Sequence, residues 1–405
     1  MSACRWVLMV ALVFLAGADW PQWLGPNRDG SSSESLNPWT TSPRVVWKQR
    51  VGEGHSSPVV ADGRVYLLAK EPNREAEVLL AFDAETGWEL WKSSYDRAPF
   101  KSIFGNGPRS TPAVVNGKVY SMGATGIVRC SDTATGKLVW QVDTAQAFHA
   151  PQLFFGASCS PLVIDGRILL NVGGKNSALV ALDAGTGKTL WATLDDGAGY
   201  SSPISFDTAG TRQAIFLTPK AILSIDPAQG HPLWRYAFAD LLGEASATPV
   251  FAHGVVVGST ITLGAVAIKP PASAGELQAV WKNPELTSYF STPVPVKDQL
   301  YMVTGTKPPA INVEATLHCV DPASGKSLWK ESRVGKYHAS LLRGGNDRLL
   351  LMSDSGRMAL VAPDANGYRE QCSAKVCGET WAHPALSGGR LYVRDADSLI
   401  CLELK

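Results

Sequence analysis

Short apolar runs separated by turn residues recur along the whole chain, and they predict β-strands. One unit has apolar runs at 161–164, 167–172, 179–183 and 188–191. None of these runs keeps the 3.6-residue period of an amphipathic helix. Asp-Gly or Asn-Gly between two apolar runs is typical of a tight hairpin, and it occurs at 62–63, 116–117 and 165–166. The pattern therefore predicts four-stranded antiparallel units and excludes a helical repeat.

Two sequence markers give the number of units. The stretch ALDAGTGKTLW at 181–191 has near-copies at 81–91, 130–140 and 319–329 and a degenerate copy at 224–234. The tryptophans at this position, spaced 43–51 residues apart, are Trp47, Trp91, Trp140, Trp191, Trp234, Trp281 and Trp329. A small residue followed by proline and an apolar run forms the second marker, at 56–60, 110–115, 159–164, 201–205, 247–251 and 291–296, with degenerate forms at 338–342 and 382–386. Together they indicate eight units.

A four-stranded unit of this length is typical of a β-propeller blade. We expect an all-β, eight-bladed β-propeller in which each repeat tryptophan docks one blade on the next and buries on the order of 200 Å². In the turn before Trp191, Gly187 can adopt positive φ while Asp183 and Thr186 satisfy turn amides. Cys130, Cys319 and Cys401 stand where other copies have alanine or serine, so we expect them to be buried core thiols.

The two ends of the repeat array predict how the ring closes. The last unit stops one strand short, while residues 44–52 have a strand and Trp47 without preceding strands of their own. We expect 44–52 to supply the outer strand of the eighth blade; the alternative is a seven-bladed ring with a free terminus. The expected organisation is a signal peptide at 1–18, an N-terminal segment that packs on the ring at 19–43, and the propeller at 44–405.

The N-terminal residues predict export. Arg5 is followed by an apolar run from Trp6 to Ala16 and by Ala-Gly-Ala at 16–18, which is the pattern of a cleaved signal peptide; an uncleaved anchor is the weaker alternative. A bacterial lipoprotein would need cysteine at the cleavage point, where Asp19 stands. We therefore expect a monomer in the periplasm, at the cell envelope or secreted, without a transmembrane segment in the mature chain.

Charge and motifs exclude several classes of function. With 37 basic and 36 acidic residues in 405, no net charge attracts nucleic acid or an anionic membrane. Catalytic serine, zinc-protease and phosphate-loop motifs are absent from the sequence, so we expect neither catalytic residues nor a metal site. Cys372 and Cys377 are close enough in sequence for a disulfide in an oxidising compartment; two unpaired thiols are the alternative.

The repeat pattern identifies a family resemblance. Ala181, Asp183, Thr186, Gly187, Lys188 and Trp191 match in full the repeat of pyrroloquinoline-quinone (PQQ) type propellers. The resemblance extends over nearly the whole mature chain, and the segment DWPQWLGPNRDG at 19–30 is similar to the start of mature secreted bacterial proteins of this class.

This resemblance implies two classes of function. Quinoprotein dehydrogenases bind PQQ and calcium over the channel, often beside adjacent cysteines and with long insertions, and this chain has neither feature. The BamB scaffold of the outer-membrane assembly machinery is non-catalytic and of comparable length. We expect a BamB-like scaffold without a cofactor that binds envelope proteins or peptide segments. The alternatives are a PQQ-dependent oxidoreductase with its site at the channel mouth, and a carbohydrate- or polymer-binding propeller.

Two groups of residues are candidates for binding. Loops before the innermost strands surround the mouth of a propeller channel, and those loops contain His55, Arg109, Tyr200, Glu244, Tyr289, His338, Trp381 and His383. They could hold an anion, a metal or a peptide, or simply bond to loops and waters. The long loops at 97–108 and 144–157 offer a candidate partner surface of Phe100, Phe104, Phe148, His149, Phe154 and Phe155; packing of these rings over the blade ends is the alternative. We expect Arg28 and Asp29 to tie the N-terminal segment across the ring.

Overall fold

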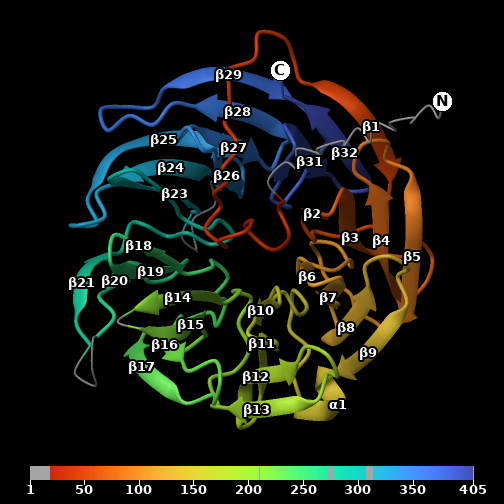
Figure 1. The fold of residues 1–405 in the computed structure, drawn as a ribbon. Coiled ribbons are helices and arrows are strands. Elements are labelled where there is room, and N and C mark those ends of the chain that lie inside the picture. Colours follow the sequence, from red (N-terminus) through yellow and green to blue (C-terminus); the bar gives the residue numbers. More distant parts are fainter. Residues whose placement is uncertain (1–18, 209, 272–276, 307–312, 405) are drawn as a thin grey trace, which may run out of the picture.

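Eight four-stranded antiparallel sheets form a closed ring around a central channel (Figure 1). The structure is a computed structural model that describes residues 19–404 except 209, 272–276 and 307–312. The predicted signal peptide at 1–18 lies outside the described residues. The all-β, eight-bladed propeller is confirmed.

Each of the first seven blades uses four consecutive strands, the innermost first. The first two blades are β2(Val59–Ala61), β3(Arg64–Lys70), β4(Ala76–Asp83), β5(Glu89–Asp96) and β6(Ala113–Val115), β7(Lys118–Met122), β8(Ile127–Asp132), β9(Leu138–Asp143). The third and fourth are β10(Leu162–Ile164), β11(Arg167–Gly174), β12(Ser177–Asp183), β13(Thr189–Thr193) and β14(Ile204–Thr208), β15(Thr211–Leu217), β16(Ala221–Ile225), β17(Pro232–Ala237). The fifth and sixth are β18(Val250–Ala252), β19(Val255–Thr260), β20(Gly264–Ile268), β21(Ala279–Asn283) and β22(Val294–Val296), β23(Gln299–Thr304), β24(Ala315–Val320), β25(Ser327–Gly335). The seventh is β26(Ala339–Arg343), β27(Leu349–Ser353), β28(Arg357–Val361), β29(Glu370–Lys375).

The eighth blade combines both ends of the chain. It contains β30(Ala385–Ser387), β31(Arg390–Arg394), β32(Ser398–Glu403) and β1(Arg44–Arg50) in that order from the channel outward. β1 pairs antiparallel with β32, from Arg44 opposite Glu403 to Arg50 opposite Ser398. The N-terminal strand therefore closes the ring as predicted. The seven-bladed alternative is wrong, because the described residues form eight four-stranded sheets and β1 is the outer strand of the eighth.

A row of three side chains explains the repeat within a blade. The small repeat residue lies directly opposite the tryptophan of the outermost strand, as Cys130 does opposite Trp140. On its other side the same cysteine faces Tyr120, and the tyrosine and tryptophan ring centroids are 6.2 Å apart. Cys319 and Cys401 hold the same position, and all three cysteines are fully buried. A small residue is needed here because the two large rings meet over it.

The same tryptophan also contacts the next blade. The indole N–H of Trp140 donates to the carbonyl oxygen of Ala184 at 2.9 Å, and the ring lies against Gly187, where a Cβ atom would come within 2.7 Å. Equivalent bonds into the following blade are made by Trp47, Trp91, Trp191, Trp281 and Trp329. Trp234 differs, because it donates to Gln213 of its own blade. The repeated turn glycine thus accommodates the tryptophan of the preceding blade.

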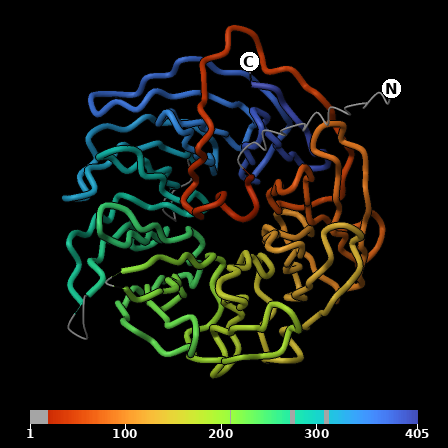
Figure 2. The backbone as a smooth tube through the Cα atoms, in the orientation of Figure 1, coloured from red at the N-terminus to blue at the C-terminus, as the bar shows by residue number. Residues whose placement is uncertain are grey.

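Residues 20–34 run into the centre of the ring and out again (Figure 2). Trp20 pairs with Val60 of the first blade, and Ser31 pairs with Arg343 of the seventh. Glu34 accepts bonds from the backbone amides of Gly388 and Gly389 in the eighth blade. This segment, which we call the plug (residues 20–34), therefore connects blades that are distant in sequence.

Arg28 anchors the plug inside the channel. Its guanidinium is buried and donates to the backbone carbonyls of Ser160, Pro161 and Pro203 at 2.8–3.1 Å. Burial lowers the pKa of Arg28 to about 10. Asp29 accepts bonds from the amide and hydroxyl of Ser31 and so shapes the plug itself.

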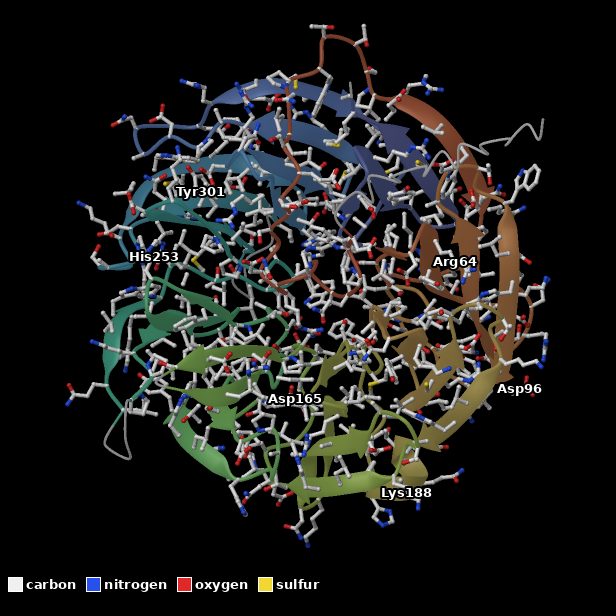
Figure 3. The ribbon with its side chains drawn as sticks, in the orientation of Figure 1. Arg64, Asp96, Asp165, Lys188, His253 and Tyr301 are labelled. Carbon is white, nitrogen blue, oxygen red and sulfur yellow. The ribbon has the colours of Figure 1, made fainter. Side chains whose placement is uncertain are left out.

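The outermost strands present polar side chains to solvent, and Figure 3 shows Asp96 and Lys188 at the periphery of the ring. Within the described residues no helix is long and apolar enough to cross a membrane. The sequence predicted a loop at 144–157, but its start is the short helix α1(Thr144–Phe148). Asp143 caps this helix by accepting bonds from the amides of residues 145 and 146.

Cys372 and Cys377 are free thiols in the structure, so the predicted disulfide does not form and the unpaired alternative applies. The physical reason is that β29 stays extended after Cys372 as far as Lys375. Cys372 lies opposite Leu360, and the pairing continues to Val376, directly before Cys377, where the Val376 amide donates to the Gly356 carbonyl. These four extended residues span about 13 Å, whereas a disulfide requires two Cα atoms within roughly 7 Å. Burial raises the pKa of Cys377 to about 12, so its thiol is in its protonated form.

Candidate functional site

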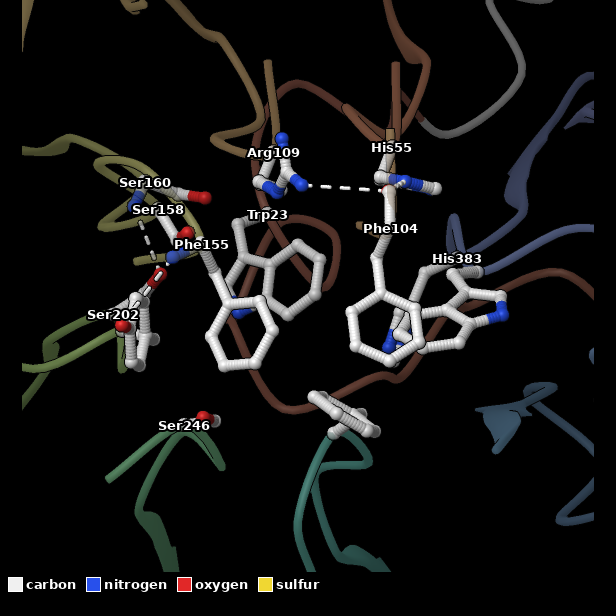
Figure 4. Close-up of a pocket in the computed structure, with 13 residues that line it drawn as sticks. Trp23, His55, Phe104, Arg109, Phe155, Ser158, Ser160, Ser202, Ser246 and His383 are labelled. Carbon is white, nitrogen blue, oxygen red and sulfur yellow. Dashed lines mark hydrogen bonds between the residues drawn. The ribbon is translucent and has the colours of Figure 1, made fainter. Parts of the chain in front are cut away.

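A cavity of about 120 Å³ opens at one mouth of the channel, above the plug (Figure 4). It is lined by Trp23, His55, Phe104, Arg109, Phe155, Ser158, Ser160, Tyr200, Ser202, Ser246, Phe290, Trp381 and His383. Except for Trp23, these residues come from the connections that lead from one blade to the innermost strand of the next. Such connections all lie on one face of a propeller, which is why residues far apart in sequence meet here. We call this cavity the mouth pocket.

Aromatic rings form the walls of the mouth pocket. The ring centroids of Phe104 and Phe155 are 5.8 Å apart, and that of Trp381 is 5.3 Å from Phe104. Phe290 continues the series at 5.0 Å from Trp381, and Tyr200 completes it at 5.4 Å from Phe155. Contacts at these separations add stability beyond the area they bury, so the walls are mutually supported.

Trp23 brings the plug into the pocket. Its indole N–H donates to the hydroxyl of Thr248 at 2.9 Å, and its ring packs edge-on to His383 with centroids 4.6 Å apart. The plug therefore contributes part of the lining of the mouth pocket.

Three histidines near the pocket are held in their neutral form. Burial lowers the pKa of His338 to about 4, and burial together with the charge of Arg109 lowers that of His55 to about 4. Burial and the neighbouring His338 lower the pKa of His383 well below its ordinary value, against a smaller opposing effect of the Phe290 backbone. At neutral pH these rings can therefore act as hydrogen-bonding groups, but not as cations.

Arg109 is the cationic group of the lining. It donates to the backbone carbonyls of Gly107 at 2.5 Å and Gly105 at 2.8 Å, while His55 bonds the Phe104 carbonyl at 2.6 Å. Burial lowers the pKa of Arg109 to about 10, so it stays charged at neutral pH. Much of its donor capacity is used to fold the loop that carries Phe104.

The structure brings together most of the predicted mouth residues. His55, Arg109, Tyr200, Trp381 and His383 line the pocket. The other three lie just behind it: Tyr289 donates to Glu244 and stacks on Phe290, and His338 lies 5.5 Å from His383 between ring centroids. Among the described residues no group of three His, Cys, Asp or Glu side chains is placed to hold a metal.

Sequence reasoning missed several lining residues. Phe290 stands one residue before the Ser-Thr-Pro marker at 291–293, so its position in the repeat could have identified it. Ser160 and Ser202 belong to the same marker, directly before its proline. Trp23 had no such signal, because the plug lies outside the repeats.

The candidate partner surface is only partly exposed. Phe100 and Phe148 are buried, at 2% and 7% exposure, so including them was wrong. Phe148 ends α1, and its carbonyl accepts a bond from Ser177; Phe100 lies beneath the guanidinium of Arg109. Phe104 and Phe155 are half-buried in the pocket wall, while Phe154 and His149 are exposed. Phe100 and Phe148 therefore pack against the blade ends and are not available to a partner.

The neutral histidines predict a loss of stability in mild acid. Between pH 6.5 and about 4 the unfolded chain binds protons on these rings while the folded chain does not, so the free energy of unfolding falls as the pH drops through this window. For the fully buried His338 the shift corresponds to roughly 3 kcal/mol. Urea unfolding at pH 7.5, 6 and 4.5 measures how steeply the free energy of unfolding falls as the pH drops. The slope should decrease in His338→Asn but not in the exposed control His149→Asn; equal slopes would contradict this assignment.

Comparison with known proteins places the fold in a family. The sequence profile of the family described as outer membrane protein assembly factor BamB matches residues 39–99, 74–331 and 313–404. BamB of Shewanella oneidensis is 25% identical over 299 residues, which are 72% of this chain and 73% of that protein. The dehydrogenase subunit of a quinone alcohol dehydrogenase from Komagataeibacter europaeus is 33% identical over 145 residues, which are 33% of this chain and 19% of that protein.

Among solved structures, the quinohemoprotein alcohol dehydrogenase of Comamonas testosteroni superposes with a TM-score of 0.72 at 16% identity, covering 96% of this chain and 80% of that one. At this identity the likeness concerns the fold alone. The BamB profile, by contrast, accounts for the sequence from residue 39 to residue 404. This protein therefore belongs to the family of PQQ-like propellers described as outer membrane protein assembly factor BamB.

Proposed function

We propose that this protein is an exported, non-catalytic scaffold of the cell envelope that binds protein segments at the mouth of its channel. The observation that carries the proposal is that the plug enters the ring and that a small aromatic pocket, lined in part by its Trp23, lies at the mouth of the channel. Membership of the BamB family supports the same function. Such a pocket suits the recognition of side chains better than the passage or turnover of a substrate.

Exposed apolar side chains near the mouth support protein binding. Ile103 is 78% exposed, Phe154 61% and Leu241 82%. Each lies in a connection that also supplies a lining residue of the mouth pocket. Apolar side chains gathered around a pocket are typical of an interaction surface. We call these three residues the rim.

The mouth pocket is a poor fit for PQQ with calcium, the cofactors of the alternative function. PQQ is a tricyclic tricarboxylate, whereas the pocket of about 120 Å³ is close in size to the roughly 150 Å³ cavity that takes up one benzene ring, so it has room for one ring and not for three fused rings. Calcium prefers several carboxylate oxygens, and the described lining has no Asp or Glu. Its one cation, Arg109, already bonds backbone carbonyls.

The test is affinity purification of tagged residues 19–405 from bacterial envelope extracts. We expect outer-membrane assembly proteins to co-purify with the parent and not with the rim variant Ile103→Ser, Phe154→Ser, Leu241→Ser. The matched control is Leu90→Ser, Leu190→Ser, Leu328→Ser, which removes equally apolar side chains, 43–48% exposed, from the outermost strands. Equal co-purification with both variants would place binding elsewhere.

A thermal-shift titration tests the alternative. A ligand at about 100 times its dissociation constant stabilises the folded state by about 2.7 kcal/mol. We expect no saturable rise in melting temperature with PQQ and calcium together. A rise that requires both would overturn the non-catalytic function.

A further inference from the structure

We propose that the mouth pocket receives the side chain of a tyrosine from a polypeptide partner, with the ring held by the aromatic walls and the hydroxyl bonded to His383. This deepens the proposed function and rests on it. The inference combines the size of the pocket, the chemistry of its walls and one buried group that has no hydrogen-bond partner.

Size limits the occupant to one ring. The cavity of about 120 Å³ is slightly smaller than the roughly 150 Å³ cavity that takes up benzene in an engineered protein core. The pocket is partly open to solvent, so a ring can enter without being enclosed on every side. This volume favours a six-membered ring, which fits with small adjustments of the walls, over the larger indole.

His383 favours an occupant with a hydrogen-bonding group at the end of its ring. Its side chain is buried, at 4% exposure. The Phe290 backbone approaches the ring closely enough to affect its pKa but not in hydrogen-bonding geometry, so neither ring nitrogen has a hydrogen-bond partner. Among the described lining residues it is the one whose buried polar atoms are unpaired in this way. Buried polar groups nearly always have a partner, so a ligand group is expected to bond here. A neutral imidazole offers one donor and one acceptor, which matches the hydroxyl of a phenol.

Other side chains fit less well. Lysine and arginine would bring a second positive charge beside Arg109, and aspartate and glutamate would lose water against apolar walls. Phenylalanine fills the same volume but leaves His383 unpaired. The rim residues Ile103, Phe154 and Leu241 favour apolar neighbours on either side of the tyrosine.

The test uses the mature chain, residues 19–405, and three blocked peptides: acetyl-Val-Tyr-Val-amide and the matching phenylalanine and tryptophan peptides. Titration calorimetry measures their dissociation constants. We expect the tyrosine peptide to bind about tenfold more tightly than the phenylalanine peptide, the effect of one buried hydrogen bond, and the tryptophan peptide to bind more weakly than both. Methyl glucoside serves as a carbohydrate probe and should not bind.

Two variants locate the interaction. His383→Phe keeps an aromatic ring against Trp23 and should abolish the preference for tyrosine while the phenylalanine peptide still binds. Trp381→Ala removes a wall and should weaken both peptides alike. Leu190→Ser on the outer edge is the control and should change nothing.

The outcomes separate this inference from the proposed function. Equal binding of the tyrosine and phenylalanine peptides to the parent, or no binding of either, overturns the tyrosine assignment even if His383→Phe fails to fold. Capture of envelope proteins that depends on the rim would leave the scaffold function standing in that case. Preferential binding of the glucoside would instead favour a carbohydrate ligand.

Discussion

Deleting residues 19–52 is expected to prevent this protein from folding as a monomeric ring. The deletion removes β1, whose backbone pairs with β32 along the outside of the eighth blade. It also removes five buried side chains from the largest hydrophobic cluster: Trp20, Leu36, Trp39, Trp47 and Val51. At about 1.5–3 kcal/mol for each buried apolar side chain, the loss is comparable with the whole stability of a typical domain, about 5–15 kcal/mol.

Exposure of β32 adds a second consequence. A bare edge strand presents unpaired amides and carbonyls to other chains and favours aggregation. Size-exclusion chromatography and far-ultraviolet circular dichroism should therefore show aggregated or unfolded protein. A monomer that melts cooperatively like the parent would contradict the closure of the ring by β1.

Two further chains separate the strand from the plug. Deletion of residues 19–43 keeps β1 with Trp47 but removes the buried Trp20, Leu36 and Trp39, so it should leave a folded but less stable ring without Trp23 in the mouth pocket. Moving residues 44–52 to follow Lys405 through a short glycine linker should restore folding to the larger deletion. This is feasible because Arg44 pairs with Glu403, so β1 starts beside the C-terminal end of β32 (Figure 1).

The fold could be predicted from the repeat because the repeated residues are the ones that pack against each other within and between blades. A small residue, a turn glycine and a tryptophan recur together since the tryptophan must cross over the small residue and rest on the glycine of the next blade, as Trp140 does with Cys130 and Gly187. The last unit lacks the strand that carries the repeat tryptophan, so the sequence also showed that its fourth strand had to come from elsewhere. With residues 44–52 as the outer strand of the eighth blade, Trp47 can dock on the first blade as the other repeat tryptophans dock on theirs.

The mouth pocket was predictable only in part. Residues just before an innermost strand, such as His383, are placed by the repeat itself, so their convergence could be expected. The direction of a side chain within a long connection follows from local contacts that no periodicity records. Phe100 and Phe104 are four residues apart in one loop, yet the first is buried and the second lines the pocket.

The plug was predictable in position but not in its consequences. Arg28 and Asp29 suggested a segment tied across the ring. Nothing in the sequence indicated that Trp23 would reach the mouth and pack against His383. That contact depends on how the plug sits in the ring, where Arg28 bonds backbone carbonyls of the third and fourth blades.

Replacing Glu77 by alanine is expected to destabilise the protein by about 3–5 kcal/mol, the usual effect of leaving one member of a buried ion pair without its partner. Both side chains of the Glu77–Arg97 pair are fully buried, 2.8 Å apart. Glu77 also accepts bonds from the Tyr95 hydroxyl at 2.6 Å and the Ala124 amide at 3.0 Å. Without the carboxylate, the guanidinium of Arg97 would keep only a longer contact of 3.4 Å to Glu75 as an ion pair.

The double variant Glu77→Leu, Arg97→Met tests whether the loss comes from the unpaired charge. It should be markedly more stable than Glu77→Ala, because apolar replacement of both members removes the uncompensated charge. The exposed pair of Asp207 and Arg212 provides the control: Asp207→Ala should change the free energy of unfolding far less than Glu77→Ala does, because exposed ion pairs contribute little. Urea unfolding at pH 7.5 measures all three variants.

The buried pair also connects stability to the mouth pocket. Arg97 donates to the Asn106 carbonyl at 2.8 Å and so holds the loop that brings Phe104 and Arg109 to the wall. We therefore expect Glu77→Ala, under conditions where it remains folded, to weaken the binding of both tyrosine and phenylalanine peptides. Asp207→Ala should leave both affinities unchanged. A Glu77→Ala protein with parental stability and parental peptide affinity would show that the ion pair neither stabilises the first blade nor positions the loop.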